Sequence, residues 1–232
     1  MKPYIVCHMI TSLDGRLHPS RFTKSPDGAR NDWSALYETM QGELDADAWI
    51  VGRVTMAEMS KAGPHAPADP GPAARPHRFA TRDAACYGIA LDRGGKLHFD
   101  RSEVQGAHVV VLLGRDVPDS HLAELAGDGV SYVVADDDDM RLAPLLETLG
   151  RELGIERLLL EGGATINGAF FAAGLVDEFS VVMTPALDGR PSSEAIVDAG
   201  EAGLADRARL SFLSCEPRAH GTVHLRYRVE PA

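Results

Sequence analysis

Short apolar runs alternate with amphipathic stretches along the chain. Apolar runs bounded by turn residues predict buried strands at residues 4–10, 48–51, 109–113, 130–135, 158–160 and 179–183. Apolar residues at helical spacing predict helices at residues 33–44, 121–126, 142–153 and 166–173. Asp32 precedes the first helical stretch and is expected to cap it. Alternating strands and helices are typical of an α/β sheet covered on both faces.

The pattern changes towards the C-terminus. Residues 210–215 and 222–229 alternate apolar and polar positions around a polar turn at His220 and Gly221. This arrangement predicts a closing antiparallel pair of strands. Together with the preceding elements, it indicates one main domain over residues 1–232.

One segment does not fit the pattern. Gly63 to Arg82 holds five prolines, at positions 64, 67, 70, 72 and 76, and is expected to form no regular structure. A loop this long in a compact domain is either a functional lid or a disordered excursion. Because it follows a candidate binding segment at 49–58, we favour the lid.

Composition narrows the class of protein. With 232 residues, 44% hydrophobic and 25% charged, the chain is an ordinary globular protein, and its net charge of −11 argues against general nucleic-acid binding. No apolar run reaches the length of a membrane span and no signal peptide is evident, so a cytoplasmic location is expected. Cys7, Cys86 and Cys215 are far apart and indicate reduced thiols without a metal pattern. The acidic run 136–139 is interpreted as solvated, with no metal assigned.

The most informative stretch is an apolar run that ends in two glycines and leads into a helix, at residues 158–167. The start of a helix leaves backbone N–H groups unpaired and carries partial positive charge, so it attracts an anion. Gly162 and Gly163 allow a tight turn and a close ligand. Alone, they would more often be a plain connection. Glu161, a carboxylate where an open sheet places its ligand, favours a phosphate site.

Two further predicted strands also end in glycine, and in both an arginine follows the glycine. Gly52 and Arg53 follow one predicted strand, with Thr55 and Glu58 on one side of the helix that begins there, and Arg115 follows Gly114 after another strand. Each exit alone fits a solvated turn. Three of them in one sheet suggest a dinucleotide along one sheet edge, and two arginines favour the 2′-phosphorylated nicotinamide cofactor, NADPH.

Four segments carry a family resemblance in the family's order, namely Ser12–Arg16, Asp47–Glu58, Leu91–Leu97 and Leu159–Pro191. They resemble the reductase domain of the bifunctional riboflavin-biosynthesis deaminase/reductase over most of the chain. The resemblance implies a dihydrofolate-reductase-like α/β fold, with a mixed, mostly parallel central sheet flanked by helices, usually in a homodimer. The zinc motif of the deaminase half, His-x-Glu followed by Pro-Cys-x-x-Cys, is missing, so we expect a stand-alone reductase.

The resemblance also implies roles for individual residues. Those matching cofactor contacts are Thr11, Gly52, Arg53, Thr55, Arg115, Gly162, Gly163, Ala164, Thr165, Ile166 and Asn167. Glu161 matches a substrate-contacting carboxylate, and Glu58 stands where the family generally has aspartate near the nicotinamide; both are the catalytic candidates. Asp14 is either a substrate contact or a structural residue that ties the loop after the first strand to a neighbouring helix.

The implied reaction is hydride transfer from NADPH to C1 of a ring-opened aminoribose on a pyrimidine phosphate. Neither a metal nor a nucleophilic side chain is required. One departure weakens this substrate assignment, because Glu38 and Glu43 occupy the helix in which a phosphate-binding arginine is expected. The alternatives are a dihydrofolate-type reductase and a nucleotide-binding protein without turnover on the same fold.

Overall fold

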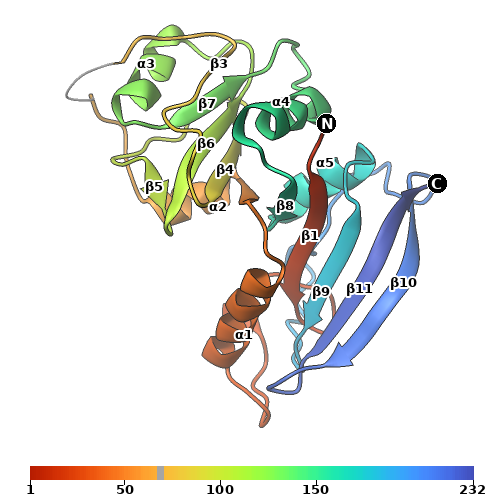
Figure 1. The fold of residues 1–232 in the computed structure, drawn as a ribbon. Coiled ribbons are helices and arrows are strands. Elements are labelled where there is room, and N and C mark those ends of the chain that lie inside the picture. The colour runs from red at the N-terminus through yellow and green to blue at the C-terminus, as the bar shows by residue number, and fades with distance from the viewer. Residues whose placement is uncertain (67–70) are drawn as a thin grey trace. The chain divides into compact units, whose positions relative to one another are not determined.

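The computed structural model describes residues 1–66 and 71–232. The described chain forms two compact units. The middle unit comprises residues 1–3 and 46–158, and the terminal unit comprises residues 4–45 and 159–232. The strand β8 (Arg157–Leu160) carries the chain from the middle unit into the terminal unit (Figure 1). Each unit is described by itself.

The middle unit contains a parallel sheet of four strands in the order β2-β4-β6-β7 (Figure 1). These are β2 (Ala48–Gly52), β4 (Tyr87–Asp92), β6 (Ala107–Leu113) and β7 (Ser131–Val134). Two short strands pair antiparallel with this sheet: β3 (His77–Arg78) with β7, and β5 (Glu103–Val104) with β6. The helices are α2 (Arg53–Ser60), α3 (Asp119–Gly127) and α4 (Leu142–Leu153). All seven residues of β6 are buried, as expected of a central parallel strand.

The terminal unit contains a mixed sheet in which β9 lies parallel to β1 and antiparallel to β11, and β10 pairs antiparallel with β11. Its strands are β1 (Tyr4–Thr11), β9 (Glu178–Met183), β10 (Ala208–Pro217) and β11 (Val223–Pro231). The helices are the short 3-10 turn η1 (Pro19–Arg21), α1 (Arg30–Glu43) and α5 (Ala164–Ala172). The predicted closing antiparallel pair is therefore confirmed.

The strand β4 carries no prediction in the sequence analysis. Its second residue is Gly88, which is a poor strand former. The register explains the glycine, because Gly88 lies opposite Trp49 of β2, and a Cβ atom at position 88 would lie 2.6 Å from the indole ring. The need for glycine at position 88 comes from a neighbouring strand, so the local sequence pattern does not reveal it.

Asp32 does not cap α1 in the predicted way. The helix begins at Arg30, and Asp32 lies in its first turn, where its Oδ2 accepts a hydrogen bond from the backbone N–H of Ala29 at 2.9 Å. The aspartate therefore stabilises the helix start from inside the helix, and the prediction that it precedes the helix was wrong by one turn.

The proline-rich segment is more ordered than predicted. Residues 67–70 lie outside the described part of the chain, and His77–Arg78 forms β3 instead of irregular structure. Several residues between 71 and 80 are tied to the middle unit: Gly71 N–H bonds Ala123 O, Ala74 N–H bonds the hydroxyl of Tyr132, and Ala80 N–H bonds Ser131 Oγ. These contacts fix residues 71–80 to α3 and β7.

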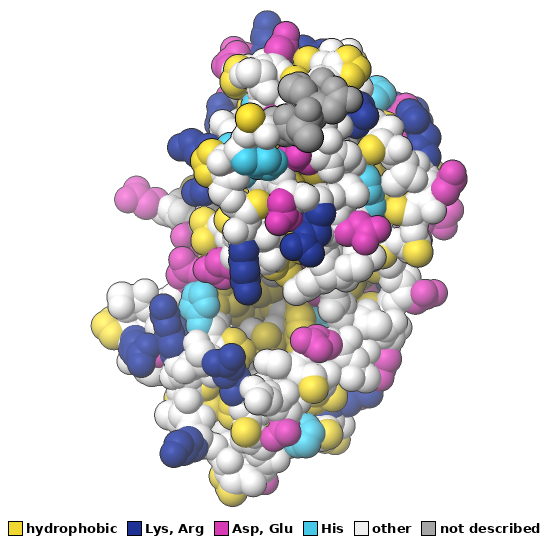
Figure 2. All heavy atoms as spheres, turned by 90° about the vertical axis from the view of Figure 1, so that its left-hand side faces the viewer, with side chains coloured by type: hydrophobic (Ala, Val, Ile, Leu, Met, Phe, Trp, Pro, Cys, Tyr) yellow, Lys and Arg dark blue, Asp and Glu magenta, His cyan; other side chains and the backbone are white. Residues whose placement is uncertain are grey.

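Two properties of the described chain are relevant to its binding partners: the distribution of charged side chains on the surface and the apolar length of the helices. On the face drawn in Figure 2, lysine and arginine side chains are interspersed with aspartate and glutamate side chains. Within residues 1–66 and 71–232, no helix has both the length and the apolar character that crossing a membrane requires.

Candidate active site

Glu161 stands at the exit of β8 and is held by two side chains of α1. The Tyr37 hydroxyl donates a hydrogen bond to Glu161 Oε1 at 3.1 Å, and Gln41 Nε2 donates to Oε2 at 3.0 Å. Tyr37 and Gln41 are four residues apart in α1, so both face the same side of that helix. The single proton of the Tyr37 hydroxyl is shared with the carbonyl oxygen of His8, which lies 2.8 Å away and ties the helix to β1.

Burial changes the protonation of this carboxylate. Removal from water raises the pKa of Glu161 to about 7, although the hydrogen bond from Tyr37 opposes the shift. Burial and the nearby Glu161 raise the pKa of Tyr37 well above its ordinary value, so the phenol keeps its proton. Glu161 can therefore hold or release a proton near neutral pH, which suits a general acid.

A buried row of polar groups continues from Tyr37. The ring of His8 stacks on Tyr37 with centroids 4.5 Å apart, His8 Nδ1 lies 2.9 Å from Ser180 Oγ, and Ser180 Oγ lies 2.8 Å from His224 Nε2. Burial, reinforced by the neighbouring His224, lowers the pKa of His8 to about 3. His8 is thus neutral and supports the Tyr37 ring without adding charge.

The two glycines after Glu161 open onto α5. Gly162 has a φ of +95° and a Cβ there would lie 3.2 Å from Met9 Cε, so a side chain at this position is disfavoured in both conformation and space. Gly163 is the N-cap of α5, has no side-chain cap, and has nothing within 4 Å of an added Cβ. The start of α5 therefore has no side-chain cap and leaves room beside Gly163, as a bound phosphate requires.

The predicted contacts on α5 have different surroundings. Thr165 is exposed, whereas Ala164, Ile166 and Asn167 are buried. The Asn167 side chain donates hydrogen bonds to Ile196 O at 2.7 Å and to Met9 Sδ at 3.2 Å. Its amide therefore anchors the helix, and only backbone atoms of these buried residues fit a cofactor role.

The loop after β1 is closed by Thr11 and Asp14. Thr11 is buried and its hydroxyl donates to Ser12 O and Arg16 O, both at 3.1 Å. Asp14 accepts hydrogen bonds from Ser12 Oγ at 2.6 Å and from the N–H groups of Asp188 and Gly189 at 3.0 and 2.9 Å. These bonds lower the pKa of Asp14 to about 2. The partner segment is a loop, which corrects the expectation of a helix.

The remaining predicted residues lie in the middle unit. Gly52, Arg53, Thr55 and Glu58 belong to the β2–α2 junction, where Arg53 and Glu58 are exposed. Because β2, β4 and β6 are parallel, this junction and the turn that carries Arg115 lie at one edge of the middle sheet. The structure therefore places the predicted residues of the middle unit at the same edge of this sheet.

The turn after β6 is shaped by its neighbour. An added Cβ at Gly114 would lie 2.4 Å from the carbonyl oxygen of Arg93, so only glycine fits this close approach. Arg115 Nη1 pairs with Asp138 Oδ1 at 3.2 Å, and both side chains are exposed. An exposed pair of this kind contributes little stability, so it leaves Arg115 available to a phosphate.

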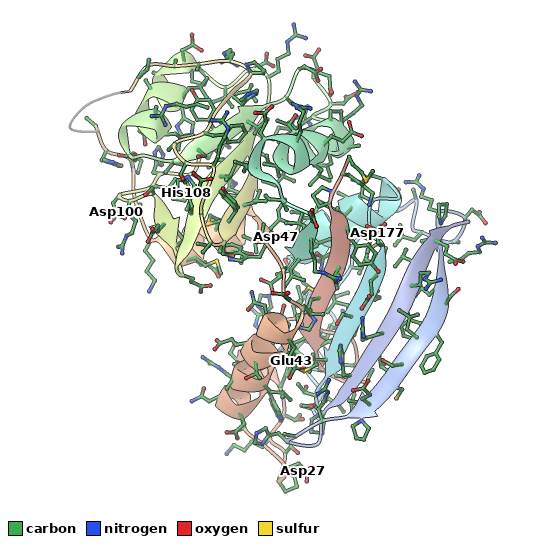
Figure 3. The ribbon with its side chains drawn as sticks, in the orientation of Figure 1. Asp27, Glu43, Asp47, Asp100, His108 and Asp177 are labelled. Carbon is green, nitrogen blue, oxygen red and sulfur yellow. The ribbon has the colours of Figure 1, made fainter. Side chains whose placement is uncertain are left out.

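The sequence analysis missed two residues of the terminal-unit site. Tyr37 is one of the residues at helical spacing that predict the helix at 33–44, and Gln41 has no distinguishing pattern. Only their four-residue spacing, facing one carboxylate, could have indicated the pair. In place of the expected arginine, Glu43 (Figure 3) forms an ion pair of 3.6 Å with Arg218.

The fold and the terminal-unit site define an α/β protein with an uncapped helix start and a partly buried carboxylate at one strand exit. The chain belongs to the RibD C-terminal domain family, whose model matches residues 3–224. It is similar to the 2,5-diamino-6-ribosylamino-4(3H)-pyrimidinone 5′-phosphate reductase of Methanothermobacter thermautotrophicus, with 29% identity over 216 residues, 91% of this chain and 92% of the relative. The predicted family is therefore confirmed.

Solved structures agree on the fold. Acinetobacter baumannii RibD has 24% identity and a TM-score of 0.66, over 99% of this chain and 58% of that chain. A pyrimidine reductase-like protein from Corynebacterium diphtheriae has 18% identity and a TM-score of 0.67, over 99% of this chain and 93% of that one. The chain thus spans little more than half of the RibD chain but nearly all of the second protein. The predicted mixed, mostly parallel sheet is confirmed.

Proposed function

We propose that the protein is a cytoplasmic, NADPH-dependent reductase of a ribosylamino-pyrimidine 5′-phosphate in riboflavin biosynthesis. Hydride from the nicotinamide would add to C1 of the ring-opened ribose, present as an imine to the pyrimidine amino group, and the imine nitrogen would take up a proton. Family membership and the pyrimidine phosphate reductase at 29% identity support this substrate over dihydrofolate.

The observation that carries the proposal is the position of the Glu161 carboxyl group, which is removed from water and held by Tyr37 and Gln41. A carboxylate with a pKa of about 7, fixed by Tyr37 and Gln41, is protonated in part of the molecules at neutral pH. It can donate that proton to the imine nitrogen, which makes C1 more electrophilic as the hydride arrives. Tyr37 and Gln41 orient the carboxyl group, and no nucleophilic side chain takes part.

The helix start of α5 fits the diphosphate of the cofactor, because it has no side-chain cap and there is free space beside Gly163. When bound, the reduced nicotinamide supplies the hydride. In the middle unit, Gly52 and Thr55 are proposed cofactor contacts, Glu58 a contact near the nicotinamide, and Arg53 and Arg115 the residues that would hold a 2′-phosphate. Thr11 would position the backbone beside the nicotinamide.

The test is NADPH binding, measured by fluorescence titration, in Gly163→Asp and Gly163→Asn. Both side chains have room and both are good helix N-caps, so both variants should fold. We expect the aspartate to abolish binding by charge repulsion and the uncharged asparagine to keep most of it. Equal affinity in both variants, or no binding by the wild type, would contradict the cofactor site.

Substrate is tested by NADPH oxidation with the ribosylamino-pyrimidine phosphate, with dihydrofolate as the alternative. We expect turnover with the pyrimidine and none with dihydrofolate. NADPH binding without oxidation of either substrate would instead favour a nucleotide-binding protein without turnover, and a preference for NADH would remove the proposed role of Arg53 and Arg115.

We further propose that the protein is a homodimer. The strand β10 lies at one end of the sheet order (Figure 1) and exposes three large apolar side chains, Leu210, Phe212 and Leu213. An exposed apolar edge strand is a surface on which a second chain can pair. Light scattering coupled to gel filtration should give the dimer mass for the wild type and the monomer mass for Phe212→Arg.

A further inference from the structure

Two histidines and a glutamate converge at the start of α3 in the middle unit. His98 Nδ1 lies 2.6 Å from Glu124 Oε1, and His121 Nδ1 lies 3.7 Å from Glu124 Oε2. Each of the three side chains offers one ligand atom within 4.8 Å of the other two. The cluster belongs to neither group of predicted cofactor and substrate residues.

The segment that carries His98 is held firmly. Asp92, at the end of β4, is buried, and its Oδ2 accepts hydrogen bonds from the N–H groups of Lys96 and Leu97 at 2.5 and 2.7 Å. Leu97 and Phe99, on either side of His98, are both buried. Their burial directs the backbone inward on both sides of His98 and places its ring at the edge of the core.

The same turn approaches α3 closely. Gly95 has a φ of +59°, and a Cβ there would lie 2.8 Å from Val117 and 3.0 Å from the ring of His121. Glycine is therefore needed at this position for both conformation and space. On α3, His121 and Glu124 are three residues apart and face the same side of the helix. The turn formed by segment 91–97, one of the four segments that carry the family resemblance, thus positions His98 beside His121 and Glu124.

His121 is the least explained member of the cluster. Its side chain is 7% exposed, and among the described residues its Nε2 is buried without a hydrogen-bond partner. A buried ring nitrogen without a partner costs free energy unless another group satisfies it. His98 and His121 are arranged edge to face with centroids 5.7 Å apart, so neither ring blocks the other from a shared ligand.

We propose that His98, His121 and Glu124 bind one divalent transition-metal ion, of which Zn²⁺ is the best match. Two imidazoles and one carboxylate are a donor set that suits zinc and disfavours magnesium or calcium, which prefer oxygen ligands. Ligand atoms about 2.0–2.1 Å from a tetrahedral ion lie about 3.3 Å apart. Side-chain rotations that move each ligand atom by about 1 Å are therefore sufficient to form the site. His98 and Glu124 are partly exposed, which leaves the fourth position to water.

A second group shares Glu124 and is the competing arrangement. His65, Glu124 and Asp128 also offer mutually close ligand atoms. There, however, the only imidazole is that of His65, which is exposed. The first group contains the more deeply buried imidazole, that of His121, whose Nε2 lacks a hydrogen-bond partner among the described residues, so the ion is assigned to it. Bound there, the ion would tie the turn after β4 to α3 and stabilise the middle unit.

The experiment is titration of tag-free, chelator-treated protein with Zn²⁺ by calorimetry and with Co²⁺ by visible absorption. We expect one ion per chain with a micromolar or lower dissociation constant, tetrahedral Co²⁺ bands, and a higher melting temperature with Zn²⁺. The variants are His98→Ala, His121→Ala and Glu124→Gln. The controls are His18→Ala and Glu147→Gln, which remove an exposed imidazole and an exposed carboxylate elsewhere.

Affinity lower by at least about tenfold in all three variants, and unchanged in both controls, would support the site. If His121→Ala does not fold, the two partly exposed positions, 98 and 124, decide the outcome. The site is overturned if the wild type binds no ion, if His98→Ala binds normally, or if His65→Ala weakens binding while His98→Ala does not. None of these readouts depends on reductase activity.

Discussion

The hydroxyl of Tyr37 in α1 donates a hydrogen bond of 3.1 Å to Glu161 at the exit of β8, across 124 positions of the chain. This bond favours the ionised carboxylate, whereas burial favours the protonated one and has the larger effect. The balance leaves the pKa of Glu161 near neutral.

Glu161→Gln should lower kcat/KM about 10²–10⁴-fold, because the amide cannot donate a proton to the imine. The wild-type rate should fall as pH rises through about 7, where Glu161 ionises, and the residual rate of the variant should lack this fall. Steady-state kinetics between pH 5 and 9 check both points. A wild-type profile that is flat through pH 7 would rule out Glu161 as the acid.

The same substitution should change stability with a definite sign. The folded-state pKa of Glu161 is raised from 4.5 to about 7, so the wild type loses stability as pH rises from 4.5 through 7. Glutamine carries no charge, so the variant should gain on the wild type over this range, by up to about 3 kcal/mol above pH 7. Urea unfolding at pH 4.5 and pH 8 measures the difference. A gain that is equal at both pH values would contradict the shifted pKa.

Tyr37→Phe should raise the pKa of Glu161 further, because it removes the bond that favours the ionised form. The fall in the pH–rate profile should therefore move to higher pH, and the free energy of unfolding should drop by about 1–2 kcal/mol. Tyr227→Phe removes a hydroxyl from β11 of the same unit and serves as the control. A loss of stability without any movement of the profile would show that Tyr37 does not tune Glu161.

Asp14→Asn should destabilise the protein at neutral pH. The folded-state pKa of Asp14 is lowered from 3.8 to about 2 by hydrogen bonds to its carboxylate, so its contribution is present above pH 3.8 and is lost as pH falls through 2. Unfolding at pH 7 and near pH 2 should show the difference from the wild type shrinking. Asp27→Asn, at an exposed position (Figure 3), is the control. A deficit that persists at pH 2 would refute the electrostatic explanation.

Gly168→Ala should destabilise the terminal unit by about 1–3 kcal/mol or more, because an added Cβ would lie 1.8 Å from the carbonyl oxygen of Asp198. The segment around Asp198 crosses α5 there, and its N–H bonds Ala164 O at 3.0 Å. Gly163→Ala, five residues earlier, meets no atom within 4 Å and should change stability far less. Thermal unfolding of both variants measures this. Equal effects would contradict the close crossing.

Many of the helices and strands follow from local patterns of apolar and polar residues, and the sequence therefore predicted them. Most of the buried strands, the α4 stripe and the closing pair β10–β11 were predicted from periodicity, since burial on one or both faces imposes it. The strand β4 was not predicted, because its Gly88 is required by the close approach of Trp49 on another strand. Asp32 was misplaced by one turn because a capping side chain can act from either side of a helix start.

The sequence by itself determined the order of Glu161, the two glycines and the start of α5, which are consecutive in the chain and form the proposed phosphate site. Only the tertiary structure decided which partners this carboxylate has. Tyr37 and Gln41 meet it through packing between distant segments, and that burial, not the residue type, raises its pKa. Packing also brings His98 close to His121 and Glu124, although His98 lies more than 20 positions before them in the sequence. Local pattern specifies elements, whereas contacts between distant side chains exist only once those elements have packed.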